Sequence, residues 1–449
     1  MTRLPWYVAA CCVLVVGSVR ADAQDTTSRV KPGAVITLAD AISIALAQNS
    51  TVRIARNTQS LDSLTVRQLR NQFQPNLSAS TNSSQGFGSR VPGSNTFSTS
   101  LGVSSGITLY NGRQNVNQLR EAELIARASG SEAERTRQTV VFTVASDFLN
   151  LITQQEQLGV QQENLVAQEE QLAQQEAFAK AGTHPIGDLY QQQAATASAR
   201  LGVATARRAT ELAKVDLIQE LVLDPRRDYQ FEVPTVQSDT SRRPIVNLDS
   251  LMDVALMRRV DIQAELLRVQ AAQREIMVAE GLKRPTITGS VGYGTSFNTG
   301  SSDNIAVQLD QRRGGSIGVG VGLPILDRGA ASIARQRAQI QLENETLALR
   351  DEMQTVGLEI RRAYLDFQSA QEQLTAADAQ QRAAVLALTA VQARYRNGLA
   401  TFVEVTLARA TLVQAQSSVV NARASLTFQR ALMSYYTGEI DAGNLGSLR

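Results

Sequence analysis

Residues 317–327 of the chain read IGVGVGLPILD, and this stretch decides the fold. Bulky apolar residues occupy alternate positions from Ile317 to Ile325, and glycine stands between them at positions 318, 320 and 322. Alternation with a period of two is typical of a β-strand that has one apolar face. We therefore predict a strand over about residues 315–326 whose second face carries almost no side chains.

Three further segments alternate in the same way, and we predict strands over about residues 76–85, 97–110 and 286–297. Their second faces consist mostly of glycine, serine and threonine, and lengths of about 10–12 residues suit tilted strands that cross a membrane. A soluble antiparallel sheet with one face on a core is the alternative. The small polar face, together with long polar loops at residues 85–95 and 298–315, instead indicates the wall of a water-filled barrel.

Four strands cannot close a membrane barrel, because the smallest barrels have about eight strands and an open edge is unstable in lipid. We therefore expect the strands to be shared between subunits. Two chains would give eight strands and an interior filled by side chains, whereas three chains would give twelve strands and room for a pore. The small residues of the inner face favour three chains.

The four strands belong to two copies of one unit. The matching residues are Leu38-Ala39-Asp40-Ala41 with Leu248-Asp249-Ser250-Leu251, Gln74-Pro75 with Arg284-Pro285, and Gly182 with Gly398. We predict a first repeat over residues 24–223, a linker over 224–247, a second repeat over 248–436 and a C-terminal tail over 437–449.

Each repeat has the same predicted order, namely a helix, two strands, one very long helix, a glycine-containing turn and a last helix. The helices are expected at about 38–73, 114–180 and 186–223, and again at 248–283, 330–396 and 401–436. The long helices would measure roughly 100 Å at 1.5 Å per residue. Leucines at 151, 158, 165 and 172 indicate a coiled-coil seam. A difference in spacing places an insertion in the second repeat, most simply in the loop after the third strand.

The first 23 residues are predicted to be a secretory signal peptide, with a basic Arg3, an apolar stretch and a cleavage site at Ala21-Asp22-Ala23. Both cysteines, Cys11 and Cys12, lie within it, so the mature chain would contain no cysteine. The alternative is that Val8-Ala9-Ala10-Cys11 is a lipidation motif. No other segment is continuously apolar over the about 20 residues that a membrane helix needs.

The composition argues against several classes of function. A formal net charge of +2 gives no strong field for nucleic acid. The one histidine, His184, and a mature chain without cysteine offer few metal ligands, and no phosphate-binding glycine motif is present. We therefore expect no enzyme activity, no metal, no cofactor and no nucleic-acid partner.

The sequence resembles the TolC-like outer-membrane efflux protein family, the outer membrane factors of tripartite efflux or type I secretion systems. The resemblance covers nearly the whole mature chain. Besides the duplicated motifs given above, it rests on Leu323-Pro324-Ile325-Leu326-Asp327 and on Tyr395-Arg396-Asn397-Gly398 followed by Phe402-Val403-Glu404-Val405. Each motif alone is weak, but their duplicated order is specific.

The resemblance implies a mainly α-helical protein with a transmembrane β-barrel portion. Three identical chains would form one 12-stranded barrel among the lipids of the bacterial outer membrane, and their helices would form a tapered periplasmic tunnel. The resemblance also implies a passive exit duct, which receives substrates from an inner-membrane pump of the RND, ABC or MFS type through a periplasmic adaptor. It indicates neither the exported substrate nor the pump class.

The resemblance also implies functional residues at the two helix–helix turns. The adaptor would meet the turn residues Gly182, Thr183, Gly398 and Leu399. Glu404 would contribute to an acidic ring at the periplasmic entrance, with Asp188 as its counterpart in the first repeat. The alternative is that both are solvated first-turn carboxylates, which the helix dipole favours.

Tyr395 matches a tyrosine that ties the closed entrance together in the family. Two gate positions depart from the family pattern, because the expected arginine is replaced by Ala400 and a second acidic residue by Leu407. The closing network would therefore be incomplete. The first repeat has Ala179 at the position of Tyr395, so any gate should depend more on the second repeat.

Two alternatives come from other classes: a secreted trimeric coiled-coil or adhesin-like structural protein, and the periplasmic adaptor itself. The first would need no duplicated strand pairs. The second would have one helical hairpin flanked by β-domains. The duplicated order of strands and helices disfavours both.

Overall fold

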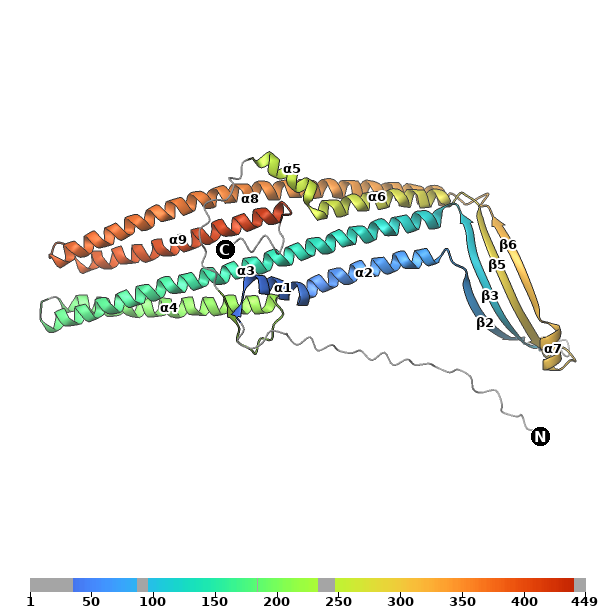
Figure 1. Cartoon of the computed structure of the whole chain (residues 1–449), viewed down its shortest axis with the longest axis horizontal. Coiled ribbons are helices and arrows are strands. Elements are labelled where there is room, and N and C mark those ends of the chain that lie inside the picture. Colours follow the sequence, from blue (N-terminus) through green and yellow to red (C-terminus); the bar gives the residue numbers. More distant parts are fainter. Residues whose placement is uncertain (1–34, 87–95, 184, 233–246, 440–449) are drawn as a thin grey trace, which may run out of the picture.

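The computed structural model describes residues 35–86, 96–183, 185–232 and 247–439. The molecule is elongated, with long helices at one end and a four-stranded sheet at the other (Figure 1). The expected signal peptide, the lipidation alternative at Cys11 and His184 lie outside the described residues, as do most of the expected linker and C-terminal tail.

Two antiparallel helical hairpins run along the helical part of the molecule (Figure 1). The first pairs α3 (Gln114–Lys180) with α4 (Ile186–Glu220), and the second pairs α8 (Ala330–Arg396) with α9 (Phe402–Tyr436). α3 also packs against α9, which joins the hairpins within one chain. The 67 residues of α3 or α8 span about 100 Å at 1.5 Å per residue, as the sequence predicted.

The helices that precede the strands are broken, so the prediction of continuous helices over 38–73 and 248–283 was wrong. The four pieces are α1 (Leu38–Gln48), α2 (Ser50–Asn71), α5 (Leu248–Arg258) and α6 (Val260–Gly281). Each break is a single residue with extended backbone, at Asn49 with ψ 128° and at Arg259 with ψ 123°.

Side-chain bonds explain both breaks. Asn49 accepts a hydrogen bond from the backbone N–H of Thr51 at 2.8 Å, so it caps α2 at the cost of continuity with α1. Arg259 is 3% exposed, and its guanidinium contacts the carboxylates of Asp261 and Glu359 at 2.5 and 2.6 Å. At each site the extended backbone residue is therefore one whose polar side chain is held by these bonds.

The sheet consists of β2 (Asn76–Gln85), β3 (Phe97–Asn111), β5 (Thr286–Asn298) and β6 (Gly314–Gly322), and the strands lie in that order. All neighbours are antiparallel, and the β3–β5 pair joins the two repeats. Val103 is opposite Tyr293, and Val291 is opposite Ile317, so the apolar residues share one face as expected. Within the described chain, β2 and β6 each have a strand neighbour on one side only.

Three features were not predicted. A short helix, α7 (Ile305–Gln311), lies in the loop between β5 and β6, where the insertion was expected. β6 ends at Gly322 rather than near 326, because the Pro324 that follows lacks the N–H of a strand residue. β1 (Val35–Ile36) and β4 (Gln230–Phe231) form a small parallel pair beside the helices.

The largest apolar core lies in the middle of the helical part, between α1, α3 and α4. Phe148, Leu151 and Leu217 are at most 1% exposed there. Tyr229 and Phe231, which lie within the expected linker, are part of this cluster. Among the described residues, no helix is both long enough and apolar enough to cross a membrane.

Candidate functional site at the helical tip

The two turns at the far end of the helices have the same geometry. Gly182 and Gly398 adopt positive φ angles of 68° and 72°, the left-handed conformation in which glycine commonly ends a helix. In the first turn the N–H of Thr183 donates to the carbonyl of Phe178 at 3.1 Å, and in the second the N–H of Leu399 donates to the carbonyl of Arg394 at 2.8 Å. These six-to-one bonds define a Schellman motif at each turn.

Exposed apolar side chains surround the second turn and the starts of α4 and α9. Their exposed fractions lie between 57% and 67%, and the residues are Ile186, Tyr190, Leu399, Val403 and Leu407. Thr183 and Gly182 of the first turn are also exposed. Only Leu399 of the apolar set was a sequence prediction. The others were missed because a short apolar series at a helix start is also typical of a packed helix.

Tyr395 joins the two repeats at the tip. Its hydroxyl accepts a hydrogen bond from Nε2 of Gln175 on α3 at 3.1 Å, and the carboxylate of Asp188 on α4 lies near enough for its charge to act on the phenol. Its ring lies 5.9 Å from the ring of Phe402. The structure thus brings together two predicted site residues, Tyr395 and Asp188, that come from different repeats.

Burial raises the pKa of Tyr395, and the negative charge of Asp188 raises it further, while the hydrogen bond from Gln175 acts in the opposite direction. The phenol therefore stays protonated near neutral pH, so it can donate to Asp188 while it accepts from Gln175. Gln175 is 1% exposed, which makes this contact a specific one between α3 and α8.

Glu404 lies apart from this cluster and closes a capping box at the start of α9. Its Oε1 accepts from the backbone N–H and the hydroxyl of Thr401, both at 3.0 Å. These bonds hold the pKa of Glu404 below its usual range, and the charge of Arg394, 3.9 Å away, adds to the effect. Glu404 is therefore ionised at neutral pH, and it has a local structural role within the chain.

A layer of buried polar residues lies roughly two to four helical turns above the tip, between α3 and α4. Gln192 donates through Nε2 to the backbone carbonyl and the side-chain oxygen of Gln168, both at 2.8 Å. Thr196 donates to the same carbonyl at 3.3 Å. The leucine pattern predicted an apolar seam here, but Gln168 and Gln175 are buried instead, whereas Leu165 and Leu172 are partly exposed.

The second face of the sheet is uniformly small and uncharged. Ideal Cβ atoms on Gly318, Gly320 and Gly322 would lie 3.0–3.2 Å from hydroxyl oxygens of β5. These hydroxyls belong to Ser290, Thr288 and Thr286. The strands β2, β3, β5 and β6, within their described bounds, contain no charged residue. Among the described residues no group of three or more His, Cys, Asp or Glu side chains is arranged to hold a metal ion.

Solved structures with the same fold are outer-membrane channels. Over 89% of the chain, the structure superposes on that of CusC with a TM-score of 0.79, at 18% sequence identity and with 92% of the CusC chain covered. It superposes on the open state of the Neisseria gonorrhoeae MtrE channel with a TM-score of 0.77, at 20% identity, with 89% of this chain and 88% of that chain covered. These likenesses establish the fold.

Sequence comparison identifies the family. The chain is 25% identical over 347 residues to the pyoverdine export outer membrane protein OpmQ of Pseudomonas putida, which covers 76% of this chain and 70% of that protein. The profile of the outer membrane efflux protein family matches residues 41–221 and 251–439, which include both hairpins and all four long strands. The chain therefore belongs to the outer membrane efflux protein family, whose members are non-enzymatic transport channels of the bacterial outer membrane.

Proposed function

We propose that the chain is the passive exit duct of a tripartite efflux or type I secretion system and acts as a homotrimer. The observation that carries this proposal is a sheet with an exposed apolar face and two unpaired edges, in a chain of an outer-membrane efflux family. Ile317, Val319 and Val321 are 70–84% exposed, which suits contact with lipid. Pairing β2 of one chain with β6 of the next in three chains gives a closed barrel of twelve strands, which leaves no edge in the membrane.

The helical tip is the proposed contact with the periplasmic adaptor. The turn residues Gly182, Thr183, Gly398 and Leu399 lie at the far end of the helices, and apolar side chains such as Val403 surround them. Apolar groups exposed at the end of a helical bundle are typical of a protein-binding surface. An inner-membrane pump would supply the energy for export.

The periplasmic entrance is proposed to be held closed by the contact between Tyr395 and Asp188. This contact ties α8 to α4, so a wider entrance requires that it breaks or that the hairpins move together. Glu404 is proposed to contribute its negative charge to the entrance ring, in addition to its role in the capping box.

The uncharged inner face of the sheet supports a barrel section that does not itself select polar solutes by charge. The hydroxyl groups and the glycine backbone of these strands can form hydrogen bonds with a solute and carry no fixed charge. The absence of glycine side chains leaves the lumen wider. The relative from Pseudomonas putida is named for the export of pyoverdine.

Conductance in planar lipid bilayers tests the duct directly. Purified trimers of the wild type should conduct weakly, and Tyr395→Phe should raise the conductance because the phenol no longer ties α8 to α4. Tyr364→Phe is a matched control, since the Tyr364 hydroxyl contacts only Gln368 of its own helix in the structure. If no variant conducts, and if the protein fractionates with soluble periplasmic proteins, the proposed duct is wrong.

A further inference from the structure

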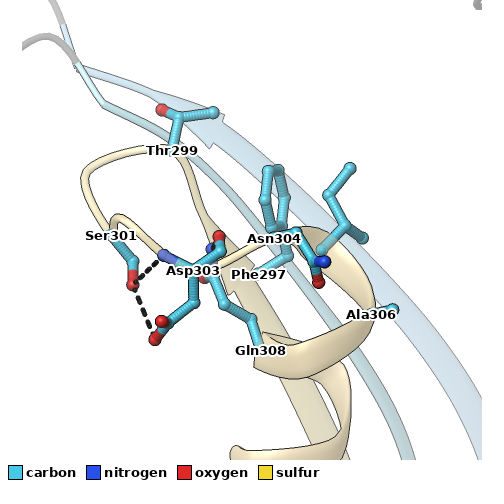
Figure 2. A pocket seen from close by; sticks show the side chains of 8 residues that line it. Phe297, Thr299, Ser301, Asp303, Asn304, Ala306 and Gln308 are labelled. Carbon is cyan, nitrogen blue, oxygen red and sulfur yellow. Dashed lines mark hydrogen bonds between the residues drawn. The ribbon is translucent and has the colours of Figure 1, made fainter.

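The short helix α7 is firmly attached to the outer end of the sheet. Thr295 donates through Oγ1 to the carbonyl of Leu309 at 2.7 Å. The side chain of Gln308, which is 1% exposed, accepts from the N–H of Asn298 at 2.9 Å and donates to the carbonyl of Asp303 at 2.7 Å. Figure 2 shows Gln308 between the helix and the turn that leads to it. The position of α7 against β5 is therefore fixed by buried hydrogen bonds.

α7 lies on the apolar face of the sheet and not on its small, polar face. Thr295 is opposite Leu101 in the β3–β5 pair, and Tyr293 is opposite Val103, so these residues share a face. Phe297 follows on the same face and lines an open groove together with Asn304 and other residues around the start of α7 (Figure 2). The helix therefore covers the end of the face that is proposed to contact lipid.

The position of α7 coincides with the expected upper boundary of the membrane. Ile287 is the partner of Tyr110 near the helical end of the sheet, and Phe297 lies ten residues further along the strand. Ten residues at about 3.3 Å each rise about 33 Å along the strand, or about 25 Å along the membrane normal at a tilt of about 40°. The apolar band of an outer-membrane barrel is about 25 Å tall and ends in aromatic residues.

The outward surface of the first turn of α7 is apolar. The side chain of Gln308 bonds Asn298 of β5, and the residues Ile305, Ala306 and Val307 make up the exposed part of the turn. The side chains of Ile305 and Val307 are 55% and 38% exposed. The second turn carries Asp310, which pairs with Arg313 just after the end of the helix at 3.1 Å.

We propose that α7 is an interfacial anchor whose first turn inserts into the outer leaflet of the membrane, beside Phe297. The inference rests on the proposed barrel, because it requires that the apolar face contacts lipid. The exposed first turn of α7 continues the apolar face of the sheet at the height where acyl chains meet headgroups. The same lipid that contacts the sheet face would therefore contact this turn. Two acidic and two basic residues between Asp303 and Arg313 cancel in charge, so the anchor acts through apolar contact and not through headgroup charge.

Tryptophan fluorescence with brominated lipids tests this placement. The only tryptophan of the sequence, Trp6, lies in the expected signal peptide, so a mature trimer cleaved after Ala23 has no tryptophan fluorescence of its own. Ile305→Trp trimers are reconstituted in vesicles of phosphatidylcholine with bromine near the top of the acyl chain, and we expect loss of fluorescence. Val319→Trp, in the middle of the apolar face, reports lipid contact of the barrel, and Ser100→Trp on the polar face should keep its fluorescence.

The controls separate failure of the anchor from failure of the duct. Quenching of both Val319→Trp and Ile305→Trp supports the anchor. Quenching of Val319→Trp alone would mean that water or another subunit covers α7, and it would overturn the anchor while leaving the barrel intact. If neither is quenched, the membrane barrel itself is wrong. Brominated phosphatidylglycerol should quench Ile305→Trp no more than brominated phosphatidylcholine, and a clear preference for it would overturn anchoring by apolar contact.

Discussion

The carboxylate of Glu404 combines a structural bond and a charge, and two substitutions separate them. Glu404→Gln keeps an acceptor for the N–H of Thr401 but removes the charge, whereas Glu404→Ala removes both. We expect Glu404→Gln to weaken the cation preference of the open channel with little change in thermal stability. Glu404→Ala should weaken it equally and also lower the melting temperature, because α9 loses the capping box.

Reversal potentials in asymmetric salt and thermal unfolding followed by circular dichroism measure the two effects. Asp378→Asn, a charge removal on α8 far along the chain from the turn, controls for general loss of negative charge. If Glu404→Gln leaves ion selectivity unchanged, Glu404 serves only as a helix cap.

Arg259 makes the second prediction at the residue scale. Burial alone would raise the pKa of Asp261, but the hydrogen bonds and charge of Arg259, with Arg135 3.2 Å away, hold that pKa below its usual value. The stabilising contribution is therefore complete above the unfolded pKa of about 3.9 and is lost as the pH falls through the lower folded pKa. Thermal stability of the wild type should decline on acidification through this window.

Replacing Arg259 by Met should weaken that part of the acid dependence, although Arg135 still faces Asp261. At pH 7 the variant should lose about 3–5 kcal/mol, because the carboxylates of Asp261 and Glu359 remain partly buried without their partner. The deficit should shrink toward pH 3, as protonation of Asp261 begins to remove the ion pair from the wild type as well. Unfolding curves at the two pH values measure the difference, and an equal deficit at both would contradict the ion-pair explanation. Arg227→Met, which removes a half-exposed ion pair, is the control.

Single residues at the tip could be found from the sequence, but their contacts could not. Tyr395 and Asp188 were proposed for different reasons, and nothing in their spacing indicated that they lie near each other. Gln175 was missed because a glutamine on a long helix is usually solvated, and only the packing of α3 against α8 and α9 buries it. Such contacts depend on how two hairpins meet, which local periodicity does not determine.

At the scale of elements, we predict that glycine-to-alanine substitutions have opposite effects on stability at the end of a long helix and within it. Gly398 has φ 72°, and a Cβ there would meet no atom within 4 Å, so only backbone strain opposes a side chain. Gly398→Ala should therefore destabilise the turn by about 1 kcal/mol. Gly357, within α8, also has open space around it, and Gly357→Ala should stabilise the helix by about 0.5–1 kcal/mol.

Thermal unfolding of the two alanine variants measures this contrast. Gly182→Ala in the first repeat should behave like Gly398→Ala, because its φ is 68°. A stabilising effect of Gly398→Ala would mean that the turn adopts another conformation in the assembled protein.

Elements whose residue pattern repeats over many residues were predictable from the sequence. Helix breaks at a single polar residue were not. The alternation of strand residues and the length between Pro75 or Pro285 and the turn glycines gave the strands and the long helices. Asn49 and Arg259 break helices whose apolar pattern continues across the break, so the pattern alone predicts one helix. α7 has only seven residues, too few for a helical period to stand out in a polar loop.

At the scale of the whole molecule, a single chain leaves sheet edges unpaired and apolar helix surfaces exposed. The sheet curves away from the helices and has two unpaired edges, and the helices carry exposed apolar residues along their length (Figure 1). Leu358 and Leu365 on α8 are 47% and 55% exposed, and Ile54 and Leu61 on α2 are 64% and 63% exposed. Three chains around an axis would cover such surfaces and close the sheet, which one chain cannot do.

Cysteine cross-linking tests the order of strands in that assembly. If cleavage follows Ala23, the mature chain has no cysteine, so disulfides can form only at introduced sites. Ala79→Cys on β2 combined with a cysteine at Ile317, Val319 or Val321 on β6 should give covalent dimers and trimers under oxidation, in the combination that matches the register. Both residues lie on the apolar face, and strands that pair bring opposite Cβ atoms to about 5 Å. The expected ladder ends at three chains because a ring of three has no free edge.

Val103→Cys on the inner strand β3, with the same β6 cysteines, should not link chains, since β3 has neighbours on both sides. Products larger than three chains would indicate open polymerisation through the same edges, and linkage through Val103→Cys would contradict the pairing of β2 with β6.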